Sequence, residues 1–341
     1  MTTPVEVDQS PRTAEASMTR PSRASAVSRL LRWESLLVLV LVVLIVGGAR
    51  VSPVFATAQN FSNLTVATME VGIMAMPMTL IIIAGEIDLS VESMLGLASA
   101  VLGFLWAAGV SLWIAIPVVL LMGAAGGLLN GLLVTRAGLP SLVVTLGTLA
   151  LFRGLASVVL GPRAISNFPG EFTAFGFGNV PGTPVPWPLV VFVVLALALG
   201  TVLHLTWPGR EVFAIGKNAS AARYSGVRVA RLKTCLFVLS GAVAAGAGII
   251  LTSRLSSARA DAGQGLTLAV VTAVLLGGVD IFGGSGTLPG VVLAVFTLAI
   301  LQNALRLADV STQLQSIAVG LLLIVSVVVP HVVIRIRGGS R

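Results

Sequence analysis

The chain has 341 residues, of which 56% are hydrophobic and only 10% are charged, and its mean hydropathy is +1.02. Soluble domains carry about 25% charged residues, so a globule of this size could not bury so much apolar surface, and a soluble fold is excluded. The net charge of +8 does not indicate nucleic-acid binding, because the basic residues gather in the N-terminal tail, one internal loop and the C-terminus. One cysteine and two distant histidines argue against a disulfide and against a zinc or haem site.

In chain order, residues 1–34 form a polar tail rich in Ser, Thr, Pro and Arg, which we interpret as a disordered cytoplasmic segment. A membrane-spanning helix needs about 20 mostly apolar residues. Residues 35–334 contain ten such segments, and residues 335–341 follow as a basic tail. The first, third and eighth segments are weaker or shorter, and two of the ten are candidates for re-entrant or broken helices. The predicted fold is therefore an all-α polytopic membrane protein. The ten segments are 35–50, 64–84, 90–109, 112–134, 140–160, 187–206, 234–252, 266–282, 287–306 and 313–334.

The distribution of basic residues predicts the orientation of these segments. Cytoplasmic loops are enriched in Lys and Arg, so the N-terminal tail is expected inside. Six spans later, the loop 208–233 carries six basic residues and one acidic residue. Four further spans bring the basic C-terminus to the same side. Both termini and this loop are therefore expected to be cytoplasmic, and the long loop at 161–187 is expected outside.

The loop 208–233 is longer than a connection between two spans requires. Its sequence ASAARYSGVRVARLK is helix-prone from Ala219 to Tyr224, and Gly226 supplies a stop. The sequence therefore predicts a short helix on the cytoplasmic face, broken by a turn. Two interpretations remain open: a solvated basic linker that only sets topology, and a docking helix for a cytosolic partner.

Two acidic sequences stand at the ends of apolar segments. In AGEIDLSVES and LGGVDIFGGSG, Asp88 and Asp280 each lie three residues after a glycine and between two aliphatic residues. Both follow an even-numbered span, so both are expected at cytoplasmic helix ends, where the glycines favour a broken helix or a tight turn. Paired interruptions in two halves of a transporter point to the transport path. We therefore interpret the two sequences as equivalent elements of two related halves.

Other polar residues lie at membrane depth, where an ionisable side chain costs about 2.5 kcal/mol or more and needs a partner or a water-filled path. Arg153 is predicted to pair with Glu70 or Asp88, either within the transport path or as an ion pair that only fixes helix register. Asn130 and Asn303 fit a path for a polyhydroxylated ligand, and hydrogen bonds between helices also explain them. The candidate residues of the path or of the helix breaks are Asp88, Ser90, Asn130, Arg153, Asp280 and Asn303.

Four stretches, in consistent order between residues 36 and 330, carry a family resemblance. They are AGEIDLSVES, VTLGTLALFRGLA, GREVFAIGKNASAARYSGVRVARLKTCLFVLSGAVAAGAGIILTSRLSSARADAG and VVTAVLLGGVDIFGGSGTLPGVVLAV. They resemble the permease subunits of bacterial ABC sugar importers, particularly the ribose, xylose, rhamnose and autoinducer-2 group. The resemblance implies a permease domain at 35–334 in the bacterial cytoplasmic membrane, surrounded by lipid, which moves a sugar or sugar-like solute. It implies a cytosolic ATP-binding subunit, an external solute-binding protein and a second permease chain as partners, and no nucleic acid.

The resemblance also implies a role for the loop 208–233. In this family the stretch that comes after the pattern GR.VFAIG.N..AA..SGV is similar to the coupling region, which sits against the ATP-binding subunit. Small residues suit this role because a partner's groove closes around a thin helix. Glu86 and Glu92 depart from the family, which usually has glycine at these positions. The coupling residues carried over are Gly216, Asn218, Ala221, Ala222, Ser225 and Gly226.

Two other functions fit parts of the sequence. An ion-coupled secondary transporter would use Asp88 or Asp280 as its proton or sodium site. An intramembrane serine protease would use Ser285 in GGSG as the nucleophile and His331 as the base, but so short a match arises easily among 37 glycines. The sequence has no G-x-x-x-x-G-K-[ST] motif, so we expect a transporter subunit that is not itself an enzyme and holds no cofactor, with ATP bound by a partner.

Overall fold

The computed structural model describes residues 23–338, with side chains described for residues 34–328. Over this range the regular structure is helical, apart from two isolated β-bridges. The first helix begins inside the segment predicted as a tail, and residues 1–22 of that prediction lie outside the described range. The thirteen helices of the described chain are α1 (Arg23–Val51), α2 (Ala58–Ile83), α3 (Val91–Ala107), α4 (Leu112–Thr135), α5 (Ser141–Leu160), α6 (Gly170–Phe177), α7 (Trp187–Leu205), α8 (Trp207–Lys217), α9 (Ala219–Tyr224), α10 (Val229–Leu255), α11 (Leu266–Leu276), α12 (Leu288–Leu307) and α13 (Thr312–Gly338).

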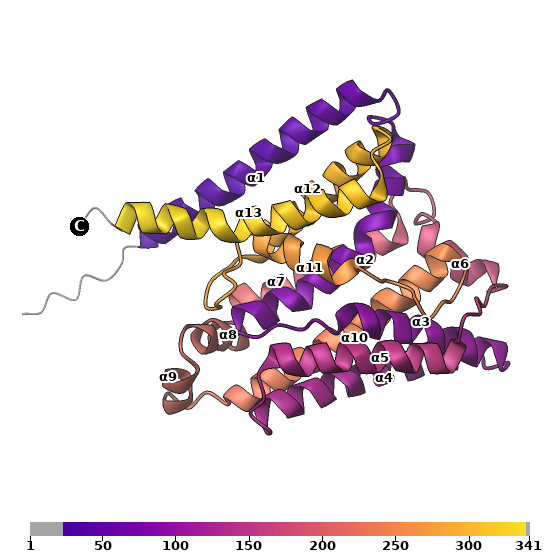
Figure 1. Ribbon diagram of the computed structural model, residues 1–341, viewed down its shortest axis with the longest axis horizontal. Helices are drawn as coiled ribbons and strands as arrows, with labels where there is room; N and C mark the ends of the chain where they lie inside the picture. Colours follow the sequence, from indigo (N-terminus) through magenta and orange to yellow (C-terminus); the bar gives the residue numbers. More distant parts are fainter. Residues whose placement is uncertain (1–22, 339–341) are drawn as a thin grey trace, which may run out of the picture.

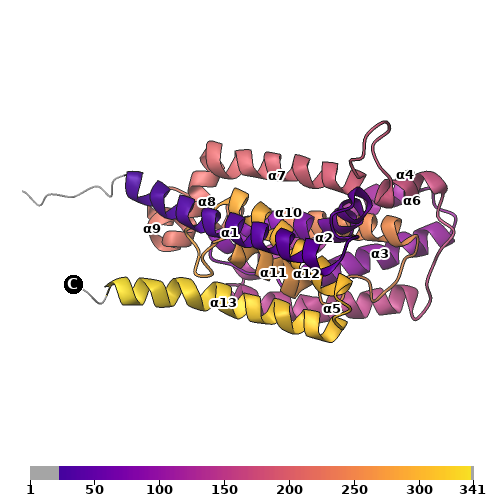
Figure 2. The same cartoon turned by 90° about the horizontal axis from the view of Figure 1, so that it is seen from above.

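Within the described range, seven helices are long and apolar enough to cross a membrane, and three shorter apolar helices accompany them, namely α3, α11 and the first part of α13. These ten helices match the ten predicted segments one for one, which confirms the all-α polytopic fold. The remaining helices α6, α8 and α9 lie in connections. Both views place α6 at one end of the molecule and α8 and α9 at the other (Figure 1, Figure 2). The loops at 161–187 and 208–233 therefore occupy opposite ends, as the predicted sidedness requires.

Helix α2 is the centre of the bundle. In its most apolar window 94% of the residues are buried, compared with 22% in α4 and 28% in α5. It packs against α7, α10, α11 and α12, and a helix that is surrounded by protein is expected to be apolar on every side. The outer helices instead expose large apolar side chains, such as Val158 on α5 and Leu197 on α7. In a membrane protein such faces meet lipid or another subunit.

Helices α4 and α10 approach each other closely through small residues. Gly123 and Gly127 of α4 lie directly against backbone atoms of α10, and a Cβ atom on Gly131 would lie 2.9 Å from the Cα atom of Thr234. Gly241 of α10 has equally little room against α4. The glycines that recur every four residues in the sequence therefore form a packing surface.

The short helix α3 begins inside the bundle. The preceding residues 84–90 are not helical and run alongside the first half of α10. Glu86 contacts Lys233 near the start of α10, and Asp88 contacts Ser240, about two turns or 10 Å further along. Because α10 has 27 residues, α3 starts close to the middle of its length.

The short helix α11 begins at the same depth. Glu92, in the first turn of α3, accepts hydrogen bonds from the backbone nitrogens of Gly265 and Thr267 at the start of α11. The loop that leads into α11 therefore enters the bundle from the opposite end to residues 84–90. Helices α3 and α11, with 17 and 11 residues, start partway through the bundle, and we call them the interrupted helices. They correspond to the third and eighth predicted segments, which the sequence indicated to be weaker or shorter than a full span.

Candidate coupling and translocation sites

Residues 208–233, which we call the basic elbow, fold into a compact corner. Asn218 ends α8, and its side-chain oxygen accepts a hydrogen bond of 2.9 Å from the backbone nitrogen of Ala221, which caps the start of α9. Gly226 closes the turn after α9 with a φ of 87°, a conformation that favours glycine. Ala222 is buried against Ile215. The short helix that ends at Tyr224 is therefore present as the sequence predicted.

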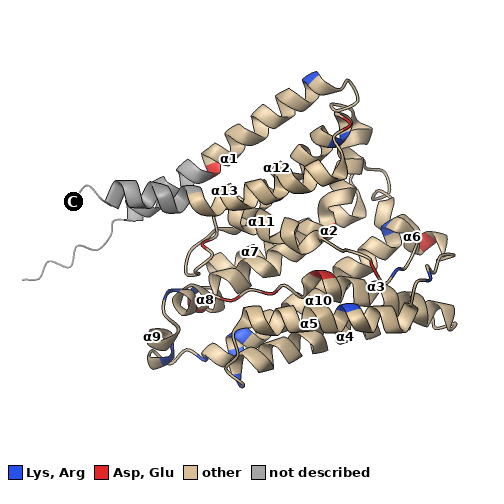
Figure 3. Ribbon diagram, viewed as in Figure 1, with Lys and Arg blue, Asp and Glu red and all other residues tan. Residues whose placement is uncertain are grey.

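The outer surface of the basic elbow is rich in cations. Arg223, Arg228 and Arg231 are exposed, and Tyr224 is 93% exposed. Ala221 and Ser225 also face outward, with the hydroxyl of Ser225 donating to the carbonyl oxygen of Ala221. Figure 3 shows Lys and Arg gathered around α8 and α9. Among the predicted coupling residues, some thus shape the corner and others lie on its surface.

Two turns and helix α8 meet where the basic elbow contacts the bundle. The backbone nitrogen of Gly284, after α11, donates a 2.8 Å hydrogen bond to the carbonyl oxygen of Ile83, at the end of α2. A Cβ atom on Gly283 would lie 2.9 Å from the Cα atom of Gly85. Gly216 of α8 lies against both the carbonyl oxygen of Ile83 and the nitrogen of Gly284, with no space for a side chain. We call Gly85, Gly216, Gly283 and Gly284 the glycine junction.

The glycine junction shows how the two acidic turns are related. The turns after α2 and α11 were predicted to be equivalent elements at the same end of the molecule as the basic elbow. They contact each other and α8 of the elbow directly through backbone atoms.

A second contact joins the basic elbow to the segment that precedes α3. The Nζ atom of Lys233 lies 2.5 Å from Oε1 of Glu86, and both side chains are only 14% exposed. This ion pair connects the start of α10 with residues 84–90.

Asp88 is the centre of a buried polar cluster. Its carboxylate accepts hydrogen bonds from the backbone nitrogen and the hydroxyl of Ser90, at 3.0 and 2.6 Å, and from the hydroxyl of Ser240 at 2.8 Å. Asn130 of α4 donates to the hydroxyl of Ser90 at 2.9 Å. The structure therefore brings together three of the predicted residues, and adds Ser240. Three donors satisfy the carboxylate of Asp88, a residue that is 1% exposed, without a cation.

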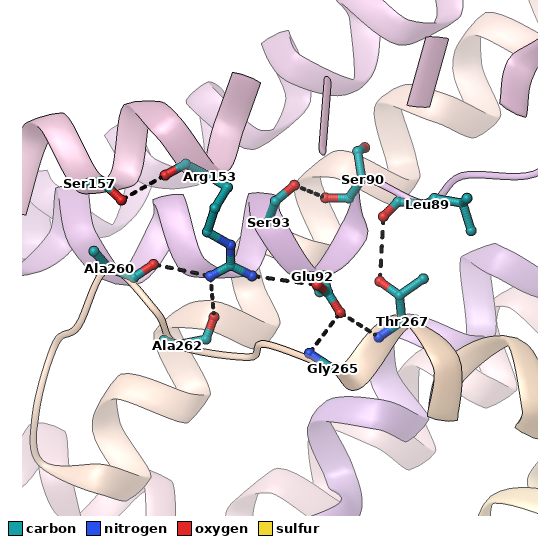
Figure 4. A network of polar contacts seen from close by, with 10 residues as sticks. All are labelled: Leu89, Ser90, Glu92, Ser93, Arg153, Ser157, Ala260, Ala262, Gly265 and Thr267. Carbon is teal, nitrogen blue, oxygen red and sulfur yellow. Dashed lines mark hydrogen bonds and ion pairs between the residues drawn. The ribbon is translucent and has the colours of Figure 1, made fainter. Parts of the chain in front are cut away.

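The predicted partner of Arg153 is wrong. Arg153 of α5 pairs with Glu92, with 3.6 Å between Nη2 and Oε1, and not with Glu70 or Asp88 (Figure 4). Its Nη1 atom donates to the carbonyl oxygens of Ala260 and Ala262 in the loop that leads to α11.

Glu92, the partner of Arg153, joins the starts of the two short helices α3 and α11. Glu92 lies in the first turn of α3 and caps the first turn of α11 with its second carboxylate oxygen (Figure 4). A carboxylate is stabilised at a helix N-terminus, where unpaired backbone N–H groups point towards it. One partly buried acid therefore holds the starts of both interrupted helices, a role that the sequence analysis did not assign to it.

Glu70 has a different partner, which the sequence prediction missed. Its Oε1 atom lies 2.7 Å from Nε of Arg254, at the end of α10. Glu70 is 2% exposed, so the guanidinium group is what compensates its charge. The pair shows that the side chain of Arg254 reaches towards the buried helix α2.

The remaining candidates lie apart from the Asp88 cluster. Asp280 accepts a hydrogen bond from the backbone nitrogen of Phe282 at 2.9 Å, which stabilises its own turn. Asn303 of α12 is buried, and its Nδ2 atom has no hydrogen-bond partner among the described residues. Ser285 contributes its carbonyl oxygen to the turn after α11, while the side chain of His331 lies outside the described residues.

This architecture is that of a membrane permease: within the described range it has ten apolar helices, two of them interrupted, and a basic corner packed against the turns after α2 and α11. Residues 60–327 match the family described as branched-chain amino acid transport system, permease component. The chain belongs to this family. The match includes the basic elbow and both acidic turns.

The curated relatives are import permeases. The autoinducer 2 import system permease protein LsrD of Yersinia enterocolitica serotype O:8 is 43% identical over 264 residues, which cover 76% of this chain and 79% of the relative. LsrD of Yersinia pseudotuberculosis serotype O:1b is 40% identical over the same shares. LsrD of Yersinia pestis strain Pestoides F is also 40% identical. No solved structure matches the chain. These relatives confirm the resemblance on which the sequence analysis drew.

Proposed function

We propose that this chain is the membrane-spanning subunit of an ATP-driven importer for a sugar or sugar-like solute, in the class of autoinducer 2, pentoses and deoxyhexoses. A separate ATP-binding subunit docks on the basic elbow, and an external binding protein delivers the solute. A second permease chain completes the pore, and both termini are cytoplasmic. The family and the relatives support the transport role, and the names of the relatives motivate the class of solute.

The glycine junction is the observation that carries the coupling role. Gly216 touches the ends of both α2 and the turn after α11 through backbone atoms, and packed backbone has no freedom to absorb a displacement. A force applied to α8 therefore moves the two turns together. The ion pair between Lys233 and Glu86 passes the same movement to residues 84–90.

The exposed cations of the basic elbow supply the docking chemistry. Arg223, Arg228 and Arg231 present positive charge beside the exposed ring of Tyr224. Aromatic residues and arginines are the side chains that dominate binding energy in protein interfaces. A partner with acidic side chains around an apolar groove fits this surface.

The test is uptake into proteoliposomes that hold the permease with its ATP-binding subunit, supplied with loaded binding protein. Gly216→Val forces the junction apart, and we expect at least a tenfold loss of uptake per ATP hydrolysed. Gly200→Ala on α7 is the matched control, because no atom lies within 4 Å of its added methyl group. Arg223→Glu, on the surface, tests docking without disturbing packing and should weaken association with the ATP-binding subunit.

Two results would overturn the proposal. One is uptake driven by a proton or sodium gradient in the absence of ATP, which would support the secondary transporter with Asp88 or Asp280 as the ion site. The other is normal coupled transport by both Gly216→Val and Arg223→Glu. Parallel assays with leucine, ribose, rhamnose and autoinducer 2 separate the amino-acid and sugar classes of solute.

A further inference from the structure

A pocket of about 420 Å³ opens at the end of the molecule opposite the basic elbow. It lies between the first turns of α2, the residues after α6 and the end of α10. Helix α2 has 26 residues and ends at the glycine junction, so its start is about 39 Å away, at the outer end. By the sidedness proposed above, this pocket faces the exterior, from which solute arrives.

The walls of this outer pocket are rich in neutral hydrogen-bonding groups. Gln59, Ser62 and Asn63 project from the first two turns of α2, and Asn179 faces them from the residues after α6. The amide of Gln59 donates to Oδ1 of Asn63 at 3.1 Å, which leaves further donors and acceptors on both side chains. Amides and hydroxyls offer donors and acceptors together, as the hydroxyl groups of a sugar require.

The loop opposite α2 is held in place by its own backbone. Asn179 forms an isolated antiparallel bridge with Pro186, and the nitrogen of Trp187 donates to the carbonyl oxygen of Gly178 at 3.1 Å. The ring of Phe177, 55% exposed, lies beside these residues and offers an apolar face for the C–H groups of a sugar ring. The backbone that carries Asn179 is therefore fixed before a ligand arrives, which lowers the entropic cost of binding.

Among the described residues that line the outer pocket, Arg254 is the only one with a charged side chain, and its charge is already compensated. It uses its Nε atom to bind Glu70, and the planar guanidinium group has two further nitrogens with hydrogens to donate. Because Glu70 neutralises the charge, the pocket presents neither an uncompensated cation for an anion nor a carboxylate for an ammonium group. A neutral ligand with several hydroxyl groups matches it better than an amino acid or a phosphate.

A second cavity at this end of the molecule has a different, charged lining. It measures about 550 Å³, and its described lining includes Arg153, Arg163, Arg259 and Asp261 but no amide side chain. Two of its guanidinium groups are already paired, Arg153 with Glu92 and Arg259 with Asp261. Arg163 has no ion pair among the described residues, so its guanidinium group is the one that suits a carboxylate or a phosphate. The neutral character of the outer pocket is therefore a local property and not a general feature of this surface.

We propose that the outer pocket is a binding site on this chain for a neutral polyhydroxylated solute of five or six carbons, which receives the solute on its way into the membrane. This assignment rests on the proposed import function and gives it a location and a ligand class. Gln59, Asn63, Asn179 and Arg254 hydrogen-bond the hydroxyl groups, and Phe177 packs against the carbon face.

The test measures direct binding first, without the delivery protein. The complete permease complex in lipid nanodiscs is titrated with ribose, rhamnose, autoinducer 2, leucine and inorganic phosphate, and saturation-transfer NMR reports contact. We expect signals from the polyols and none from leucine or phosphate. Asn63→Ala and Asn179→Ala should each weaken the binding of the preferred polyol about fivefold to tenfold, the effect of one hydrogen bond. Gln264→Ala, an exposed amide outside the pocket, should leave binding unchanged.

Transport assays separate the two proposals. If the wild-type complex takes up a polyol with ATP, and the Asn63→Ala and Asn179→Ala variants bind and transport it as the Gln264→Ala control does, the pocket assignment is overturned and the import function stands. If the wild-type complex binds no polyol in nanodiscs, the pocket assignment also fails. If polyols bind at the pocket but ATP drives no uptake, the import function fails while the site remains.

Discussion

Asp88 and Asp280 occupy matching positions after α2 and α11, but their surroundings differ. Asp88 is buried and binds three donors, one of them Ser240 on another helix, whereas Asp280 is partly exposed and bonds to its own turn. The difference arises from the path of the chain beyond each acid. The chain after Asp88 enters the bundle and begins α3 there, so the backbone needs a buried acceptor. The chain after Asp280 turns at Gly283 and Gly284 and leads into α12. Similar sequences thus serve a buried helix start in one half and a surface turn in the other.

The largest effect is expected for Asp88→Ala, which tests whether the buried aspartate holds the start of α3. The substitution removes the acceptor for Ser90 and Ser240 and leaves both hydroxyls buried, so we expect the free energy of unfolding to fall by about 3 kcal/mol or more. Thermal unfolding in detergent measures the change. Asp88→Asn keeps one oxygen acceptor and should cost less. Equal stability of Asp88→Ala and the wild type would show that the cluster contributes nothing to holding α3.

The next largest effect is expected at the acid that links α3 to α11. Glu92→Ala leaves the N–H groups of Gly265 and Thr267 without an acceptor and Arg153 without a carboxylate, at a cost of about 2 to 3 kcal/mol. A double-mutant cycle with Arg153→Met, by chemical denaturation, isolates the ion pair. We expect the two costs to be less than additive. Strict additivity would mean that Glu92 acts only as a helix cap.

A smaller loss of stability is expected for Glu86→Gln, which tests the coupling of ATP hydrolysis to uptake separately from folding. Glu86→Gln removes the charge that pairs with Lys233, and because both groups are partly exposed we expect a loss of only about 1 kcal/mol in unfolding free energy. Uptake per ATP hydrolysed should nevertheless fall severalfold, since the elbow loses its ion pair with residues 84–90. Lys233→Met should reproduce this phenotype. An unchanged coupling ratio in both variants would leave the glycine junction as the sole route.

The smallest effect on stability is expected at Asp280, in the turn after α11. Asp280→Ala removes one hydrogen bond to the nitrogen of Phe282 at a partly exposed position, worth about 0.5 to 1 kcal/mol. Unfolding and uptake should remain close to the wild type, and Asp280→Asn should be indistinguishable from it. If Asp280→Ala were as damaging as Asp88→Ala, the two acids would be equivalent in function in spite of their different surroundings.

The sequence predicted the helices much better than their partners. All ten segments were found because the length and apolar character of a span are local properties, fixed by the thickness of the bilayer. The corner at Asn218 and the stop at Gly226 were likewise visible, since caps and glycine turns act within a few residues.

Pairings between distant charges could not be predicted in this way. Arg153 was expected to reach Glu70 or Asp88, and it binds Glu92 instead. The choice depends on the depth at which α3 begins, which the long-range contact of Asp88 with Ser240 determines. A sequence shows which charged side chains need partners at membrane depth. The depth of each side chain in the bundle, and therefore its partner, depends on how the helices pack.

The position of Glu70 in the buried helix α2 has a consequence for how the protein is made. Arg254, which compensates it, lies 184 residues further along the chain. Translation proceeds at about 5 to 20 residues per second. Glu70 is therefore without its partner for roughly 10 to 40 seconds before Arg254 is synthesised. The second span must therefore be sheltered by insertion machinery, or remain near the membrane surface, until α10 arrives to complete the bundle around it.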